Sequence, residues 1–131
     1  MRIEDLEVYR IAGGINKCGW DIYTKMKSEY RFGIGQQFIR AIDSIGANIA
    51  EGFGGYHYLD SVKFYYNARG SLWESKYWVD LLHERDLIQD EIYKPIIEKL
   101  DVLGVKINNF ISSIKSRANK DNNSNYSVKI F

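Results

Sequence analysis

Apolar residues recur every three or four positions along most of the chain, which is the spacing of one buried face on an α-helix. Four segments carry this pattern: about residues 3–27, about residues 36–53, a segment from just after Asp60 or Ser61 to about residue 86, and about residues 90–116. Short connections join these segments, so neighbouring helices should run antiparallel. The pattern therefore predicts an all-α fold, an up-down-up-down antiparallel four-helix bundle that occupies residues 1–116.

Two further segments interrupt or follow the helical pattern. Residues 30–35, Tyr-Arg-Phe-Gly-Ile-Gly, break the spacing and predict a turn between the first two helices. Residues 117–131 are rich in Asn and Ser, which is typical of a flexible C-terminal tail. The apolar residues near its end, Val128, Ile130 and Phe131, leave two readings open: a frayed terminus, or a segment that docks on the bundle or on a partner.

Residues 44–55, Ser-Ile-Gly-Ala-Asn-Ile-Ala-Glu-Gly-Phe-Gly-Gly, are rich enough in glycine to suggest a phosphate-binding loop. Such a loop ends in Gly-Lys-Ser/Thr, because the lysine neutralises the phosphate charge. No lysine follows Gly52, and the Glu51 carboxylate would repel a phosphate. The stretch is better explained as the end of the second helix. Gly46 should then sit where another helix passes closely, since a glycine inside a helix costs about 1 kcal/mol relative to alanine.

The composition narrows the class of protein. The chain has 131 residues, of which 45% are hydrophobic, a net charge of +1 and a single cysteine. These values fit one globular domain in a reducing compartment, since one thiol cannot form an internal disulfide. No stretch approaches the roughly 18–20 apolar residues of a membrane span, and the charged N-terminus is unlike a secretory signal. We expect a cytoplasmic protein without membrane contact, whose balanced charge gives no bulk attraction to nucleic acid.

The sequence lacks the spacing of familiar metal and catalytic sites. A di-iron bundle uses Glu-x-x-His motifs, and the nearest approach is Asp80 followed by His83. Cys18 has no second cysteine with which to bind zinc, and we expect it to be a buried, inert thiol. We therefore expect no metal, no cofactor and no enzymatic activity.

Polar residues of the second and third helices are spaced to meet on one side of the bundle. Asn48 and Glu51 lie three positions apart on one helix face. We expect a structural cluster, with Glu51 paired to an arginine and Asn48 bonded across helices, that comprises Arg40, Asn48, Glu51, Arg69 and Glu74. The competing hypothesis is a small enzyme in which Glu51 acts as general base with Arg40 or Arg69, although no partner acid, histidine or metal is evident.

Basic residues form a modest stripe on the first helix. Arg10, Lys17 and Lys25 fall within one helical face, and on the third helix Lys76 lies seven positions after Arg69. Nearby acidic residues neutralise part of this charge, and mixed charge is usually only a solvated surface. An oligomer would repeat the stripe and enlarge it. We therefore take Arg10, Lys17, Lys25 and Lys76 as the candidate nucleic-acid-binding residues.

The third helix carries aromatic residues on two faces. Tyr65 and Leu72 belong to its inner stripe, whereas Tyr66, Trp73 and Tyr77 share a second face. Exposed aromatic patches usually mark interfaces, so we expect this second face to be a subunit interface. A docking site for another protein and a platform for stacking nucleic-acid bases are the alternatives.

Several motifs resemble those of a known family. They are Asp5-Leu6-Glu7-Val8-Tyr9, Gln37 with Arg40-Ala41, Ser44-Ile45, Asn48-Ile49-Ala50-Glu51-Gly52-Phe53, Ala68-Arg69-Gly70-Ser71-Leu72 and Glu74. Over roughly residues 5–112 the chain is similar to the four-helix-bundle family named after proteins encoded in intervening sequences of bacterial 23S ribosomal RNA genes. It departs from the family pattern at Gly33, where a proline is usual, and at Ile39 and Gly55, where basic residues are common.

The resemblance implies a bundle that assembles into a ring-like homopentamer and has no known catalytic activity. The family is also similar to accessory proteins of diversity-generating retroelements, which bind nucleic acid through a basic pentameric surface. Binding of RNA or DNA is therefore an expectation of the resemblance, which the absence of two basic residues weakens. A protein–protein adaptor or scaffold without nucleic-acid binding is the alternative.

Overall fold

The structure is a computed structural model that describes the backbone of residues 1–55 and 58–124 and the side chains of residues 1–55 and 60–120. In chain order its elements are a 3₁₀ turn η1 (Ile3–Asp5), α1 (Glu7–Lys25), α2 (Ser28–Tyr30), a π-helical turn η2 (Arg31–Gly35), α3 (Gln36–Phe53), α4 (Tyr58–Glu84) and α5 (Asp90–Ser124). No strand occurs in these backbone ranges. Because α1, α3, α4 and α5 carry the fold, the predicted all-α class is confirmed.

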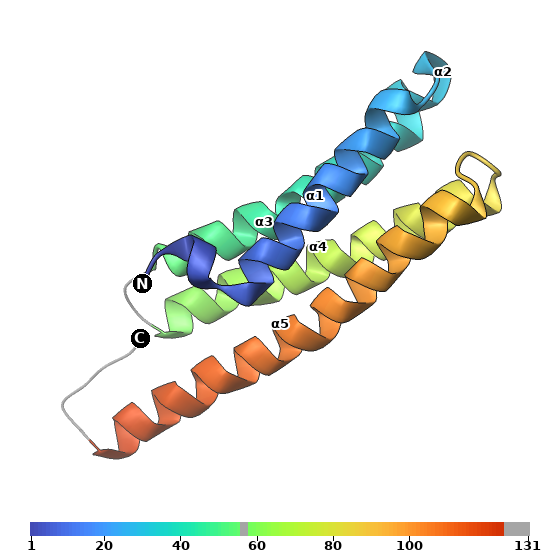
Figure 1. Cartoon of the computed structure of the whole chain (residues 1–131). Helices are drawn as coiled ribbons and strands as arrows, with labels where there is room; N and C mark the ends of the chain where they lie inside the picture. The colour runs from blue at the N-terminus through green and yellow to red at the C-terminus, as the bar shows by residue number, and fades with distance from the viewer. Residues whose placement is uncertain (56–57, 125–131) are drawn as a thin grey trace.

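The four long helices form an antiparallel bundle in which each helix packs against two neighbours (Figure 1). α1 packs against α3 and α5, and α4, which also packs against α3 and α5, occupies the diagonally opposite corner. Successive long helices run in opposite directions, which confirms the predicted up-down-up-down topology. All four contribute to a largely aliphatic core, with fully buried side chains that include Ile15, Phe38, Ile45, Leu72 and Ile107. None of the described helices is both long and apolar enough to cross a membrane.

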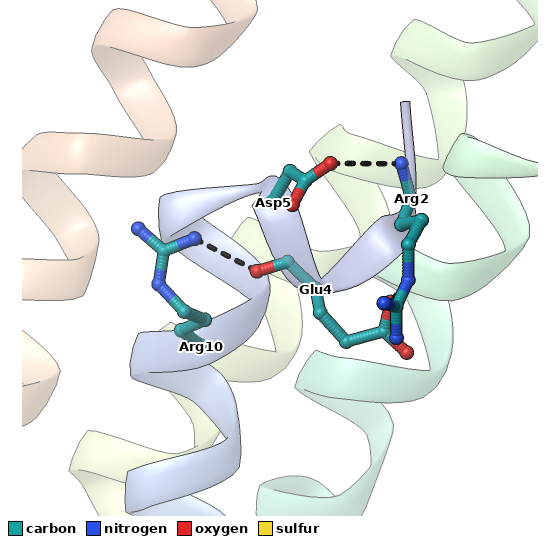
Figure 2. A network of polar contacts seen from close by, with 4 residues as sticks. All are labelled: Arg2, Glu4, Asp5 and Arg10. Carbon is teal, nitrogen blue, oxygen red and sulfur yellow. Dashed lines mark hydrogen bonds and ion pairs between the residues drawn. The ribbon is translucent and has the colours of Figure 1, made fainter.

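The N-terminal turn is tied to α1 by hydrogen bonds (Figure 2). The backbone N–H of Arg2 donates to the Asp5 carboxylate at 3.0 Å, and the Arg10 guanidinium donates to the Glu4 carbonyl at 2.8 Å. Leu6, the N-cap of α1, provides no side-chain acceptor for the first turn of that helix. The bond from Arg10 therefore holds the turn against α1 and directs the guanidinium toward the N-terminus.

The connection between α1 and α3 differs from the sequence prediction. The chain turns at Met26 and Lys27, whose backbone is extended, and residues 28–53 are then helical without a break. Gly33 and Gly35 lie inside that helical stretch, so the turn predicted over residues 30–35 is wrong. Packing gives the reason: a Cβ on Gly35 would lie 2.9 Å from Met26 Sδ, so this glycine lets the chain fold back tightly against the end of α1.

Close packing between helices occurs at Gly19 and Gly52 rather than at Gly46, where the sequence predicted it. A Cβ on Gly19 of α1 would lie 2.9 Å from the Ile42 side chain, and a Cβ on Gly52 of α3 would lie 2.6 Å from the Tyr65 ring. A Cβ on Gly46 would meet nothing within 4 Å, so the expected close approach of another helix there is wrong. Gly46 instead lines a shallow groove between α1 and α3.

The α4–α5 connection is a short turn built around Asp86, whose φ is +59°. The N–H of Asp86 donates to the His83 carbonyl at 3.0 Å, and the N–H of Leu87 donates to the Leu82 carbonyl at 2.8 Å. This pair of bonds is the Schellman pattern, which satisfies carbonyl groups at a helix end. α4 consequently ends at Glu84, close to the predicted end near residue 86.

Helix α5 is longer than the sequence indicated. It begins at Asp90 as predicted and continues to Ser124 rather than ending at Ser116, and Figure 1 shows it running past the ends of the other helices. Ala118 is buried, so the apolar spacing continues into a stretch whose Asn and Ser content suggested a tail. Such residues are only moderately poor helix formers, and one packed face is enough to extend a helix. The predicted docking residues Val128, Ile130 and Phe131 lie outside the described residues.

Candidate functional site

Three aromatic side chains of α4 line the outer surface beside α5, and we call Tyr66, Trp73 and Tyr77 the aromatic face. Trp73 and Tyr77 are 62% and 57% exposed, and Tyr66 is half-buried. On its inner side the same helix buries Leu72 in the core, so α4 has apolar side chains on two faces. Large aromatic side chains gathered in water are typical of a contact surface.

Cations lie over the rings of the aromatic face. The Arg69 guanidinium carbon is 4.7 Å from the centroid of the Tyr66 ring, and Lys76 Nζ is 4.5 Å from the centroid of a Trp73 ring. From α5, Lys115 Nζ lies 5.4 Å from the Tyr66 centroid and donates to the Tyr66 hydroxyl at 2.8 Å. Exposed cation–π contacts stabilise by about 0.5–1 kcal/mol each, so these rings are held in defined positions.

Polar contacts across the α4–α5 seam hold the cations in turn. Lys76 Nζ is 2.7 Å from the Asp101 carboxylate, and the Arg69 guanidinium donates to the Asn108 side chain at 3.0 Å. The hydrogen bond from Lys115 lowers the pKa of the Tyr66 hydroxyl, because the ammonium stabilises the phenolate. The surface is therefore aromatic at its centre, with positive charge that α5 partly neutralises.

Sequence reasoning missed the contribution of α5 to this surface. Val105 is 61% exposed, and the ion pair between Lys76 and Asp101 sets a helix register that puts Val105 at about the level of Trp73 along the seam. A signal was present, because Asp101 and Val105 are four positions apart and share a helix face. Spacing within α5 does not reveal which neighbour that face meets, since register between helices is a tertiary property.

The structure separates the candidate nucleic-acid-binding residues. Arg10, Lys17 and Lys25 are exposed on α1, whereas Lys76 lies on α4 in the opposite corner of the bundle. Lys25 pairs with Asp21 at 3.1 Å, and Lys76 pairs with a carboxylate of α5. The four cations therefore form no continuous basic surface within the chain, and the basic stripe is confined to α1.

Helix α1 also carries an exposed aromatic residue beside that stripe. Trp20 is 56% exposed and lies three residues after Lys17, which puts the two on neighbouring parts of one face. Its ring centroid is 5.5 Å from that of Tyr23. A cation next to exposed rings is a feature of surfaces that stack nucleic-acid bases.

The α3 members of the predicted polar cluster do not meet the other members in the described part of the chain. Asn48 donates to the Ser44 carbonyl one turn earlier, at 2.9 Å, rather than across helices. Arg40 and Glu51 are exposed, and neither takes part in an ion pair among the side chains of residues 1–55 and 60–120. The reason is the orientation of α3 about its axis. Residues such as Ile49 occupy the face toward the core, so Arg40 and Glu51 point toward solvent.

On α4 the remaining members of that cluster have other partners. Arg69 contacts Tyr66 and Asn108 at the seam with α5. Glu74 accepts a long hydrogen bond of 3.5 Å from the Trp78 ring nitrogen on the same helix. These contacts orient side chains of α4, and they bring neither residue to Glu51.

A cluster of polar residues that the sequence analysis did not predict lies at the other end of the α4–α5 seam. His83 Nε2 and Asp90 Oδ1 are joined by a hydrogen bond of 2.6 Å, and the His83 ring stacks on Tyr93 at 4.0 Å between centroids. The Tyr93 hydroxyl donates to Asp80 at 2.7 Å. The bond from His83 lowers the pKa of Asp90, and the bond to Asp80 raises the pKa of Tyr93. The Asp80 and His83 spacing was visible, but their partners on α5 were not.

Metal-ligand and thiol chemistry have little support among the described residues. No group of three or more His, Cys, Asp or Glu among them could hold a metal ion. Cys18 is half-buried rather than buried as expected. This partial burial raises the pKa of its thiol, against an opposing effect of Lys99, and a thiol with a raised pKa is a poor nucleophile at neutral pH. Burial also raises the pKa of Tyr65 to about 12. Both groups are therefore mainly protonated at neutral pH.

These features define a small all-α protein built as an antiparallel four-helix bundle. The chain belongs to the 23S rRNA-intervening sequence protein family, whose profile matches residues 4–109, so the resemblance seen in the sequence is confirmed.

A solved structure shares the fold. It is a protein of unknown function from the S23 ribosomal protein family of Bacteroides thetaiotaomicron VPI-5482, with a TM-score of 0.75 and 23% sequence identity. The similarity covers 79% of this chain and 97% of that one, and at this identity it shows the fold alone. A search of curated proteins found no match.

Proposed function

We propose that the protein is a non-enzymatic, self-associating helical bundle whose subunits meet through the aromatic face. The exposure of Trp73 and Tyr77 carries this proposal. Aromatic side chains of this size bury about 150–250 Å² each when covered, at about 25 cal/mol per Å². Leaving both in water on one helix forgoes several kcal/mol of stabilisation, which a second subunit would recover.

The surroundings of these rings suit a protein contact better than a phosphate contact. Lys76 is neutralised by Asp101, and Arg69 already donates to Asn108. On α5, exposed Val105 adds apolar surface at about the level of Trp73. An aromatic and aliphatic centre with paired charges at its edge is the usual composition of a protein interface.

We propose that the assembly is a homopentamer, which is the stoichiometry implied by family resemblance. A ring of five copies uses head-to-tail contacts, so the aromatic face of each subunit would meet a different surface of its neighbour. The role of such a ring is binding or scaffolding. The lack of a metal-ligand group among the described residues and the raised pKa of the Cys18 thiol support that role over catalysis.

The test is the mass in solution, measured by light scattering after size exclusion over a hundredfold range of protein concentration. The wild-type chain should elute near five times its 15.3 kDa mass. The oligomer of the Trp73→Ala variant should dissociate into single chains at protein concentrations at least tenfold higher than those at which the wild-type oligomer dissociates. The matched control is Trp20→Ala, which removes a similarly exposed tryptophan from α1 and should leave the assembly unchanged.

Each outcome decides between specific alternatives. A wild-type mass of a single chain at all concentrations would overturn self-association. An unchanged assembly in Trp73→Ala would mean that the aromatic face serves another protein, as in the adaptor hypothesis. A stable oligomer of another size would retain the interface and overturn the pentamer.

A second candidate function is the binding of RNA or DNA through α1, and the exposed Trp20 beside Lys17 favours it. Arg10 and Lys25 would extend this stripe, and an oligomer would repeat it. Fluorescence anisotropy of a structured RNA and a duplex DNA at low and physiological salt tests the idea. Lys17→Gln should lower the slope of log affinity against log salt concentration by about one, which corresponds to one lost phosphate contact. Lys63→Gln on α4 should leave that slope unchanged. Absence of binding at low salt would refute it.

A further inference from the structure

A pocket of about 290 Å³ opens at the end of the bundle where η1, the end of α3 and the start of α4 meet α5. Its apolar walls are formed by Leu6, Phe53, Tyr65, Phe110 and Ile114. Gly52, Gly55 and Ser61 also line it, and their small size leaves the space open. It is separate from the aromatic face, which lies on the outer surface of the α4–α5 seam.

The walls of this pocket are preformed. The rings of Tyr65 and Phe110 pack edge to face, with centroids 4.8 Å apart, and Tyr65 is almost fully buried. Gly52 packs directly under the Tyr65 ring, so the ring cannot move in that direction. An apolar pocket with rigid walls binds an apolar group without a cost for ordering its own side chains.

The chain carries an apolar segment within reach of the pocket. Residues 125–131 read Asn-Tyr-Ser-Val-Lys-Ile-Phe, and three of the last four are large and apolar. Arg117 lies at the pocket and Ser124 ends the described helix seven residues later, which is about 10 Å at 1.5 Å per residue. Seven further residues can span up to about 23 Å, which is enough to return over that distance.

We propose that the pocket binds residues 128–131 of its own chain through Val128, Ile130 and Phe131. The size of the pocket favours this occupant, because about 290 Å³ is at the lower end of ligand pockets and suits a few side chains of one short segment rather than a helix face. The reach from Ser124 favours the same chain over a second copy. This inference does not depend on the proposed self-association.

The experiment is disulfide cross-linking in the full-length chain, on a Cys18→Ala background. Ser113 lines the pocket, whereas its neighbour Ser112 does not and lies about 100° around α5. Lys129 lies in the segment without contributing an apolar side chain. Two double variants are compared. One combines Ser113→Cys with Lys129→Cys, and the matched control combines Ser112→Cys with Lys129→Cys. For each we measure the rate of thiol loss and the mass of the product.

The Ser113→Cys pair should form an intrachain disulfide at least tenfold faster than the Ser112→Cys pair. Equal rates for the two pairs would overturn docking in the pocket. Products that are mainly dimers of the chain would overturn docking within one chain and assign the pocket to the segment of a second copy.

A binding measurement gives an independent test. A fluorescein-labelled peptide of residues 125–131 is titrated with the full-length chain and with the full-length double variant Val128→Asp, Ile130→Asp. The variant should bind the peptide at least tenfold more tightly, because its own segment no longer competes. Equal affinities would contradict the proposal, and circular dichroism establishes that both chains are folded.

Discussion

The Cβ position of Gly52 lies 2.6 Å from ring atom Cε1 of Tyr65, so no side chain fits at position 52 while the ring keeps its place. Tyr65 is buried and packed on Phe110, so it has little room to yield. Gly52→Ala should therefore lower the free energy of unfolding by about 1–3 kcal/mol, as overpacking does in other cores. Urea denaturation at a fixed protein concentration measures this change.

Gly46→Ala should act in the opposite direction. A Cβ at Gly46 meets nothing within 4 Å, so only the helix propensity changes. Alanine should raise the free energy of unfolding by about 1 kcal/mol. Destabilisation at this position would mean that Gly46 contacts another subunit, since the single chain provides no clash.

The turn between α4 and α5 permits a test of backbone strain. Asp86 has a φ of +59°, in the left-handed region where a non-glycine residue pays about 1–2 kcal/mol and where glycine is strain-free. We compare Asp86→Gly with Asp86→Ala, because both remove the carboxylate. The glycine variant should be more stable than the alanine variant by about 1 kcal/mol in thermal or urea unfolding. Equal stabilities would show that the turn relaxes out of this conformation.

The fold was predictable because its main signal is local. Residues such as Ile42, Ile45 and Ile49 repeat at helical spacing, and that periodicity predicted a helix over the same residues that α3 occupies. The turn near Met26 was missed because Gly33 and Gly35 are ordinarily helix breakers. Here the close approach to Met26 favours glycine inside a helix, and that approach is a tertiary contact.

The candidate site was only partly predictable for a related reason. The outward position of Trp73 and Tyr77 follows from the periodicity of α4 itself. The partners of those residues depend on the register between α4 and α5, which the sequence does not display. The same limit explains why Glu51 was expected to meet an arginine, since a shared helix face does not determine which residues of the next helix it meets.

The hydrogen bond between His83 and Asp90 should make stability depend on acid pH. It lowers the pKa of the Asp90 carboxyl in the folded state from an ordinary value of 3.8. A lowered folded-state pKa contributes stability that is present above the unfolded value and is lost as pH falls through the folded value. Wild type should therefore lose stability below about pH 3.8 more steeply than Asp90→Asn.

His83→Gln tests the cause of that pH dependence. If the bond from His83 is responsible, this variant should lose the same part of the acid slope, and adding Asp90→Asn to it should change little further. Urea midpoints from pH 7 down to the acid limit of folding measure both variants. Additive effects of the two substitutions would contradict a shared interaction.

The two residues expected to be joined in a polar cluster should now behave differently. Glu51 is exposed and has no ion-pair partner among the described side chains, so Glu51→Gln should change the free energy of unfolding by less than about 0.5 kcal/mol. Arg69 donates to Asn108 and lies over the Tyr66 ring, so Arg69→Ala should cost about 1–2 kcal/mol. Unfolding of each variant at a concentration below oligomer formation isolates the effect within one chain. If Glu51→Gln lowered the free energy of unfolding by more than about 1 kcal/mol, the polar-cluster hypothesis would be supported again. An exposed carboxylate contributes that much only when it has a specific partner.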